Sequence, residues 1–153
     1  MHAPARALTH RLVFFLSVLF ALVTSGCALF TSHYDAGAYQ NFTNLKAFHL
    51  KFLEDQTAQE GATYSEERMT SACDVGELKF READEYARGK GDSLRIDALD
   101  VLHNVFKDNC KLARKQKKLF NPVYINELTP TLTRNYDLAI AGELARVKNP
   151  NSK

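Results

Sequence analysis

The sequence predicts an all-α protein, an antiparallel up-down-up-down four-helix bundle over residues 35–149. After residue 40, apolar side chains recur with the helical period, and no long stretch alternates with the period of two typical of a strand. Short breaks separate the periodic segments, which favours helices that pack as antiparallel neighbours. The chain has 153 residues, 45% hydrophobic and 25% charged, which suits a single globular domain.

The first two helices are separated by a break at Gly61. Residues 35–57 form the first, and its predicted buried face comprises Ala38, Phe42, Leu45, His49, Phe52, Leu53 and Gln56. Ser65 opens the second, whose first turn is acidic, as the helix dipole favours, and residues 89–91 end it. Its predicted buried face comprises Met69, Ala72, Cys73, Gly76, Phe80, Ala83 and Ala87.

The last two helices begin at Asp92 and at the pair Asn121-Pro122, a cap followed by proline in the first turn. The third helix is predicted to bury Leu94, Ala98, Leu102, Val105, Phe106, Ala113 and Phe120, with Leu99 and Cys110 on its flank. The fourth is predicted to bury Ile125, Leu128, Leu132, Tyr136, Ala139 and Ile140. Pro130 predicts a kink or a split in this helix, and residues 150–153 are predicted to be a frayed tail.

Cys73 and Cys110 lie symmetrically about the turn at residues 89–92. In an antiparallel hairpin, this symmetry places both cysteines at the same level. A disulfide requires Cα atoms about 4.4–6.8 Å apart, closer than the usual 8–10 Å between helix axes. The small residues Ala72 and Gly76 permit such an approach. We therefore expect a disulfide, and the alternative is two buried thiols that face different neighbours.

The N-terminal segment has the features of a signal peptide. Residues 1–11 contain two arginines and no acid, and residues 12–23 are apolar except for Ser17. A spanning helix needs about 20 apolar residues, so this run has instead the length of a signal-peptide core. Arg6 and Arg11 account for the formal net charge of +2. The remainder of the chain is neutral, which argues against nucleic acid as a partner.

The sequence Val23-Thr24-Ser25-Gly26-Cys27 resembles a bacterial lipobox, although Thr24 occupies a position where leucine is usual. The resemblance covers residues 1–27 only, and it implies that residues 1–26 are removed and that Cys27 carries the lipid. Residues 27–34 would then be a lipidated tether. Ala28 in place of aspartate implies the outer membrane of a Gram-negative cell, with the protein facing the periplasm. The alternatives are an ordinary secretory signal with a coincidental cysteine, or an uncleaved anchor.

A run of basic side chains ends the third predicted helix. The five residues are Lys111, Arg114, Lys115, Lys117 and Lys118. In the bundle this run lies away from the lipid anchor, near Glu60, Glu66 and Glu67. One interpretation is a solvated helix end that these acids partly neutralise. The other is a docking patch for an anionic partner, either an acidic protein surface or a cell-wall polymer.

His49 lies at the centre of the apolar face of the first helix. We interpret it as a core histidine with a hydrogen-bond partner among Asn109, Gln116 and Tyr136. The alternative is a haem or metal ligand, because helical bundles build such sites. However, the sequence contains neither a Cys-x-x-Cys-His motif nor a Glu-x-x-His motif. We therefore expect no metal and no cofactor.

The motifs favour binding over catalysis. The sequence has no Gly-x-Ser-x-Gly motif, no glycine-rich phosphate loop, and no histidine at a useful spacing from Cys73 or Cys110. We expect a non-enzymatic, membrane-anchored periplasmic lipoprotein that acts as a binding, accessory or scaffold module, including the role of an inhibitor or exclusion factor. The alternative from another class is a haem- or metal-binding bundle that uses His49. A third possibility is a structural tether between membrane and cell wall.

Overall fold

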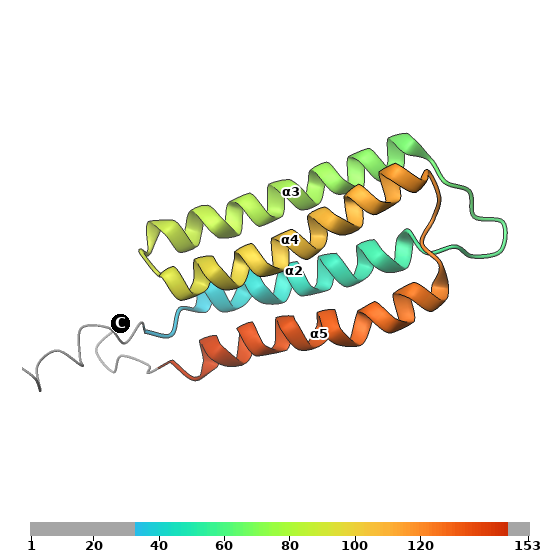
Figure 1. Cartoon of the computed structure of the whole chain (residues 1–153). Helices are drawn as coiled ribbons and strands as arrows, with labels where there is room; N and C mark the ends of the chain where they lie inside the picture. Colours follow the sequence, from blue (N-terminus) through green and yellow to red (C-terminus); the bar gives the residue numbers. More distant parts are fainter. Residues whose placement is uncertain (1–32, 147–153) are drawn as a thin grey trace, which may run out of the picture. The chain divides into compact units, whose positions relative to one another are not determined.

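The computed structural model describes residues 33–146, and within this range four helices form a bundle (Figure 1). The predicted all-α four-helix bundle is confirmed for this range. The predicted signal peptide (1–26), Cys27, most of the tether and the tail (150–153) lie outside the described residues. Within residues 33–146, no helix is both long and apolar enough to cross a membrane.

Each helix begins after a polar side chain that accepts hydrogen bonds from backbone N–H groups of the first turn. The four helices are α2 (Ala36–Asp55), α3 (Glu66–Gly89), α4 (Ser93–Gln116) and α5 (Pro122–Leu144). Their caps are Asp35, Ser65, Asp92 and Asn121. The last two caps are the ones that the sequence predicts. α5 continues through Pro130 and is therefore not split there, while the kink stays a prediction.

The buried faces of α2 and α3 agree closely with the predicted stripes, although Gln56 and Ala72 are only half-buried. On α5, Ile125, Leu132 and Tyr136 are buried as predicted, whereas Leu128, Ala139 and Ile140 are half-buried. α4 differs because its buried face is turned toward the flank that carries Leu99 and Cys110. Leu94, predicted to be in the core, is 67% exposed. The neighbouring Arg95 is 5% exposed and takes the place in the core that was predicted for Leu94.

Contacts at the two ends of the bundle show which helix ends lie together. At one end, the N–H of Asp35, which caps α2, donates to Glu143 near the end of α5. Lys90 after α3 pairs with the same Asp35. At the other end, the connection after α2 and the connection after α4 exchange backbone hydrogen bonds through Phe120. The described chain therefore enters and leaves the bundle at one end, and α4 ends at the opposite end (Figure 1).

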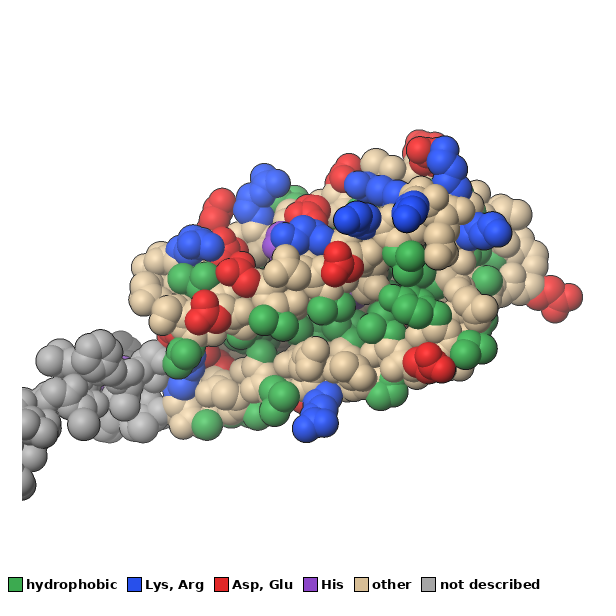
Figure 2. Space-filling model, viewed as in Figure 1, with side chains coloured by type: hydrophobic (Ala, Val, Ile, Leu, Met, Phe, Trp, Pro, Cys, Tyr) green, Lys and Arg blue, Asp and Glu red, His purple; other side chains and the backbone are tan. Residues whose placement is uncertain are grey.

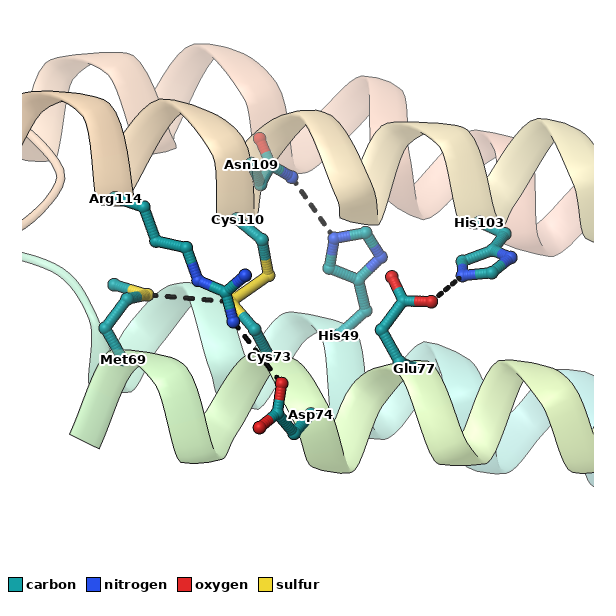
Figure 3. The surroundings of a disulfide bond; sticks show 9 residues. All are labelled: His49, Met69, Cys73, Asp74, Glu77, His103, Asn109, Cys110 and Arg114. Atoms are coloured by element: carbon teal, nitrogen blue, oxygen red, sulfur yellow. Dashed lines mark hydrogen bonds and ion pairs between the residues drawn. A yellow bond between two sulfur atoms is a disulfide. The ribbon is translucent and has the colours of Figure 1, made fainter. Parts of the chain in front are cut away.

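A disulfide joins Cys73 of α3 to Cys110 of α4, with their Cα atoms 6.0 Å apart (Figure 3). The pairing is the one that the symmetry of the two cysteines about the turn predicts. Both residues are buried, and Met69 packs beside Cys73. Gly76, one turn further along α3, faces the ring of Phe106, and a Cβ atom there would overlap this ring. Glycine at this position therefore allows α3 and α4 to pack closely beside the disulfide.

Candidate functional site

The predicted basic patch is one surface of the folded chain. Its members are Lys111, Arg114, Lys115, Lys117 and Lys118, and all five side chains are exposed on or just after the last two turns of α4. Lys117 ends the helix in the left-handed conformation, with φ of 49°, and its N–H donates to the carbonyl of Ala113. The patch lies at the end of the bundle opposite to Asp35.

Acidic residues of α3 neutralise the basic patch only in part. Arg114 Nη2 lies 3.4 Å from Asp74 Oδ1, and Lys117 Nζ lies 3.5 Å from Glu66 Oε2. Glu66 is one of the predicted neighbours, whereas Asp74 is not. Both ion pairs are long and largely exposed, and such pairs contribute little stability. The guanidinium and ammonium groups can therefore exchange these partners for a stronger anionic one at small cost.

His49 is a core residue whose two ring nitrogens both have hydrogen-bond partners in the described part of the chain. Asn109 Nδ2 lies 3.2 Å from His49 Nε2, and Tyr136 Oη lies 3.1 Å from His49 Nδ1. The hydroxyl of Tyr124 donates to Asn109 Oδ1, which directs the Asn109 amide N–H toward His49. Two of the three predicted partners are correct, and Gln116 is exposed instead.

The hydrogen bonds with Asn109 and Tyr136 give His49 a structural role in the core. With Nε2 accepting from Asn109, the proton of the neutral ring lies on Nδ1 and is donated to Tyr136. The lone pair on Nε2 and the proton on Nδ1 are then both engaged in hydrogen bonds with protein groups. Within residues 33–146, no cluster of three or more His, Cys, Asp or Glu side chains could hold a metal ion.

The stability of the bundle should fall between pH 6.5 and pH 4 because of His49. Burial lowers the pKa of this imidazole from 6.5 to about 4. In that pH range the unfolded chain binds a proton that the folded chain does not, so acid favours unfolding. We expect the free energy of unfolding to decrease by roughly 3 kcal/mol over the range.

Urea unfolding of the wild-type chain and of His49→Gln at several pH values measures this effect. Glutamine retains hydrogen-bonding groups but does not titrate, so the decrease should be much smaller in the variant. The pKa of Asp35 is about 2, so this carboxyl contributes only at lower pH. An equal acid sensitivity of the two chains would show that His49 is not responsible.

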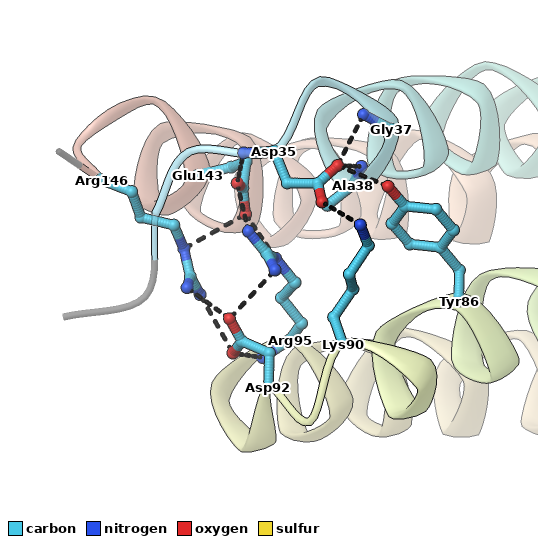
Figure 4. A network of polar contacts seen from close by, with 9 residues as sticks. All are labelled: Asp35, Gly37, Ala38, Tyr86, Lys90, Asp92, Arg95, Glu143 and Arg146. Carbon is cyan, nitrogen blue, oxygen red and sulfur yellow. Dashed lines mark hydrogen bonds and ion pairs between the residues drawn. The ribbon is translucent and has the colours of Figure 1, made fainter. Parts of the chain in front are cut away.

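A second polar cluster lies at the end of the bundle where the chain enters and leaves (Figure 4). We call it the end network, and it joins three acids and three bases from or beside all four helices: Asp35, Lys90, Asp92, Arg95, Glu143 and Arg146. Arg95 Nε and Nη2 donate to the two carboxylate oxygens of Glu143 at 2.9 and 2.7 Å. Arg146 binds Asp92 at 2.6 Å. The three positive and three negative charges balance, and Asp92, Arg95 and Glu143 are buried, whereas Lys90 is exposed.

Asp35 connects the end network to the first turn of α2. Burial alone would raise its pKa, but hydrogen bonds from the Tyr86 hydroxyl and from the backbone of α2, together with Lys90, lower this pKa to about 2. The same hydrogen bond to Asp35 raises the pKa of Tyr86. The carboxylate is therefore charged throughout the physiological pH range, and the network keeps its charge balance there.

The end network was not predicted, although the sequence contains a signal for it. Arg95 precedes Leu99 by four residues and Leu102 by seven, and this spacing places it on the buried face of α4. Glu143 follows Tyr136 by seven residues and falls on the buried face of α5 in the same way. A single base and a single acid at core positions of two neighbouring helices indicate a buried ion pair.

The fold and its polar clusters define a helical bundle in which buried polar groups pair with one another and five exposed cations gather at the end of α4. Comparison of the chain with models of protein families, with curated proteins and with solved structures gave no match.

Proposed function

We propose that the protein is a lipid-anchored periplasmic binding module of the outer membrane that presents its basic patch to an anionic partner. The observation that carries this proposal is the placement of the patch. The described chain enters the bundle beside Asp35, and the patch occupies the last turns of α4 at the opposite end. A lipid on Cys27 would hold the entry end at the membrane and leave the patch facing away from it.

The distance between the two ends supports a partner other than the protein's own membrane. α4 has 24 residues, so it is about 36 Å long at 1.5 Å per residue. The field of charged headgroups is screened over about 8 Å at physiological ionic strength. The basic patch of an upright bundle would therefore lie beyond the reach of its own leaflet, where it can meet an acidic protein surface or a cell-wall polymer.

The proposal is tested by reversing the charge of the basic patch in the full, membrane-anchored chain. The variant carries Arg114→Glu, Lys115→Glu, Lys117→Glu and Lys118→Glu. We expect recovery of the partner by affinity isolation from membranes, or co-sedimentation with purified peptidoglycan, to decrease at least tenfold. The two assays separate a protein partner from a cell-wall polymer.

A matched control reverses four exposed cations elsewhere on the bundle: Lys51, Arg81, Lys107 and Arg134. This control changes the net charge by the same amount, so it should retain binding if the patch itself is recognised. The Cys27→Ser chain serves as a second control, because without lipid it should leave the membrane fraction. Binding that survives reversal of the patch would refute docking through this surface.

A further inference from the structure

The end of the bundle where the described chain enters and leaves exposes two leucines. Leu94, the second residue of α4, is 67% exposed, and Leu144, the last residue of α5, is 54% exposed. The two helix ends lie together, because Arg95, next to Leu94, pairs with Glu143, next to Leu144 (Figure 4). We call this surface the entry tip, and it comprises residues 34–37, 88–95 and 143–146.

The entry tip turns its acids inward and its bases outward. The side chains of its three acids, Asp35, Asp92 and Glu143, are at most 17% exposed, and each is paired within the end network. The side chains of Arg88 and Lys90 are 57% and 50% exposed. The entry tip contains four bases and three acids, so it carries one positive charge in excess. Its exposed side chains are therefore aliphatic, basic or small.

The nearest exposed acids along the helices lie about one turn further into the bundle. Glu85 of α3 and Asp97 of α4 are each four residues from the helix end at the entry tip, about 6 Å along the axis. Arg88 pairs with Asp84, in the same turn as Glu85. A flat surface that approaches the entry tip would thus meet leucines and cations before carboxylates. The interface of a lipid bilayer accepts both kinds of side chain, aliphatic groups at the acyl boundary and cations at the phosphates.

The lipid of the proposed function would bring the entry tip to a bilayer, and the inference rests on that lipid. Residues 27–34 contain no Asp, Glu, Lys or Arg. The eight residue steps from Cys27 to Asp35 span at most about 28 Å. A contact between the entry tip and the leaflet would then form within one tethered molecule. Tethering raises the effective concentration of such a contact, so a small surface is sufficient.

We propose that the entry tip is a second membrane contact, in which Leu94 and Leu144 enter the interface of the leaflet that holds the lipid of Cys27. Arg88 and Lys90 then lie at the level of the phosphate groups, and anionic lipids strengthen the contact. The occupant of this surface is therefore a lipid bilayer. The contact holds the bundle upright, so the basic patch is directed away from the membrane by two attachments and not by the tether alone.

Tryptophan fluorescence tests the proposal, because the chain contains no tryptophan. Leu94→Trp and Leu144→Trp place a reporter at the entry tip, and Val123→Trp places one at the exposed start of α5, at the opposite end. The full lipidated chain is reconstituted in nanodiscs of phosphatidylcholine and phosphatidylglycerol, with brominated or ordinary acyl chains. We expect brominated lipid to lower the fluorescence of both tip reporters at least about twofold and to leave that of Val123→Trp unchanged.

The side of the bundle offers the competing orientation. Figure 2 shows hydrophobic side chains along the line between α4 and α5, where Leu138 is 62% exposed. Leu138→Trp should be quenched much less than Leu94→Trp if the bundle stands upright. In the Leu94→Trp chain, Leu144→Asp should remove most of the quenching, whereas the matched control Leu138→Asp, on the same helix, should not. Circular dichroism checks that each variant keeps its helices.

Several outcomes would overturn the proposal. Equal quenching of Leu138→Trp and Leu94→Trp would show that the bundle lies on its side. A chain that co-elutes with the nanodiscs but shows no quenching at the tip reporters would refute the contact and leave the lipid anchor intact. Mass spectrometry that finds no lipid on Cys27 would refute the anchor and this proposal with it. The variant with a reversed basic patch should keep the quenching, so failure of the entry tip and failure of the patch can be told apart.

Discussion

Replacement of Glu143 by glutamine should lower the free energy of unfolding by about 3–5 kcal/mol. Glu143 is 2% exposed and receives two hydrogen bonds from Arg95, which is 5% exposed. Without the carboxylate, the buried guanidinium of Arg95 would lose part of the negative charge that balances it. The end network would then carry a net positive charge. Urea unfolding of the full chain at neutral pH, followed by circular dichroism, measures the change.

Glu127→Gln is the matched control, because Glu127 is an exposed residue of the same helix. Surface substitutions of this kind usually change stability by less than about 0.5 kcal/mol. The paired change Arg95→Met with Glu143→Leu removes both charges together and should recover much of the loss, since apolar replacements of a buried pair are often neutral. If Glu143→Gln and Glu127→Gln unfolded alike, the end network would have no stabilising role.

Loss of the Cys73–Cys110 disulfide should lower the free energy of unfolding by about 4 kcal/mol. The two cysteines are 37 residues apart, so the bond closes a long loop and restricts the unfolded chain. The effect is measured by urea unfolding of the oxidised chain and of the same chain after reduction. Because both sulfur atoms are buried, the reductant has to be applied during unfolding or at equilibrium in urea.

The double variant Cys73→Ala with Cys110→Ala separates the bond from other effects of the reductant. Its stability should be low and should not respond to reduction. Both alanines fit the buried sites without a polar group left unpaired. A reductant that destabilised the variant and the wild-type chain equally would contradict a stabilising disulfide between these residues.

Much of the fold follows from local features of the sequence. The helical period locates α2, α3 and α5, and the caps at Asp92 and Asn121 locate where α4 and α5 begin. The disulfide could be predicted because two cysteines symmetric about a short turn must meet in a helical hairpin. These inferences depend on short stretches of sequence and on one turn, so they need no knowledge of how the four helices associate.

The buried face of α4 could not be predicted as accurately. A search for the most apolar stripe selects Leu94, whereas the folded chain buries Arg95 because Glu143 and Asp92 are there to neutralise it. Compensation of this kind depends on residues of another helix and is invisible in a pattern read along one helix. A hollow between α4 and α5, lined by residues such as Ala98, Val101 and Leu138, was not predicted for the same reason, since it depends on the spacing between two helices.

The residues of the basic patch and its place at one end of the bundle were predicted. His49 was predicted to be a core residue, and two of its predicted partners are correct. In both cases the residue types are unusual for their surroundings. Five cations within eight positions, and a histidine within an apolar stripe, stand out in the sequence before any packing is known. The partner of the patch depends on another molecule, which the chain's own sequence does not encode.

In the proposed lipid-anchored form, the end network would have a mechanical consequence. A pulling force on that segment reaches the bundle at Asp35, whose N–H is bound to Glu143 of α5 and whose carboxylate is bound to Tyr86 and Lys90 beside α3. The load is therefore shared by several helices at once. The first turn of α2 cannot separate from the bundle until these bonds break. The network therefore resists a pulling force at the residue where the described chain enters the bundle.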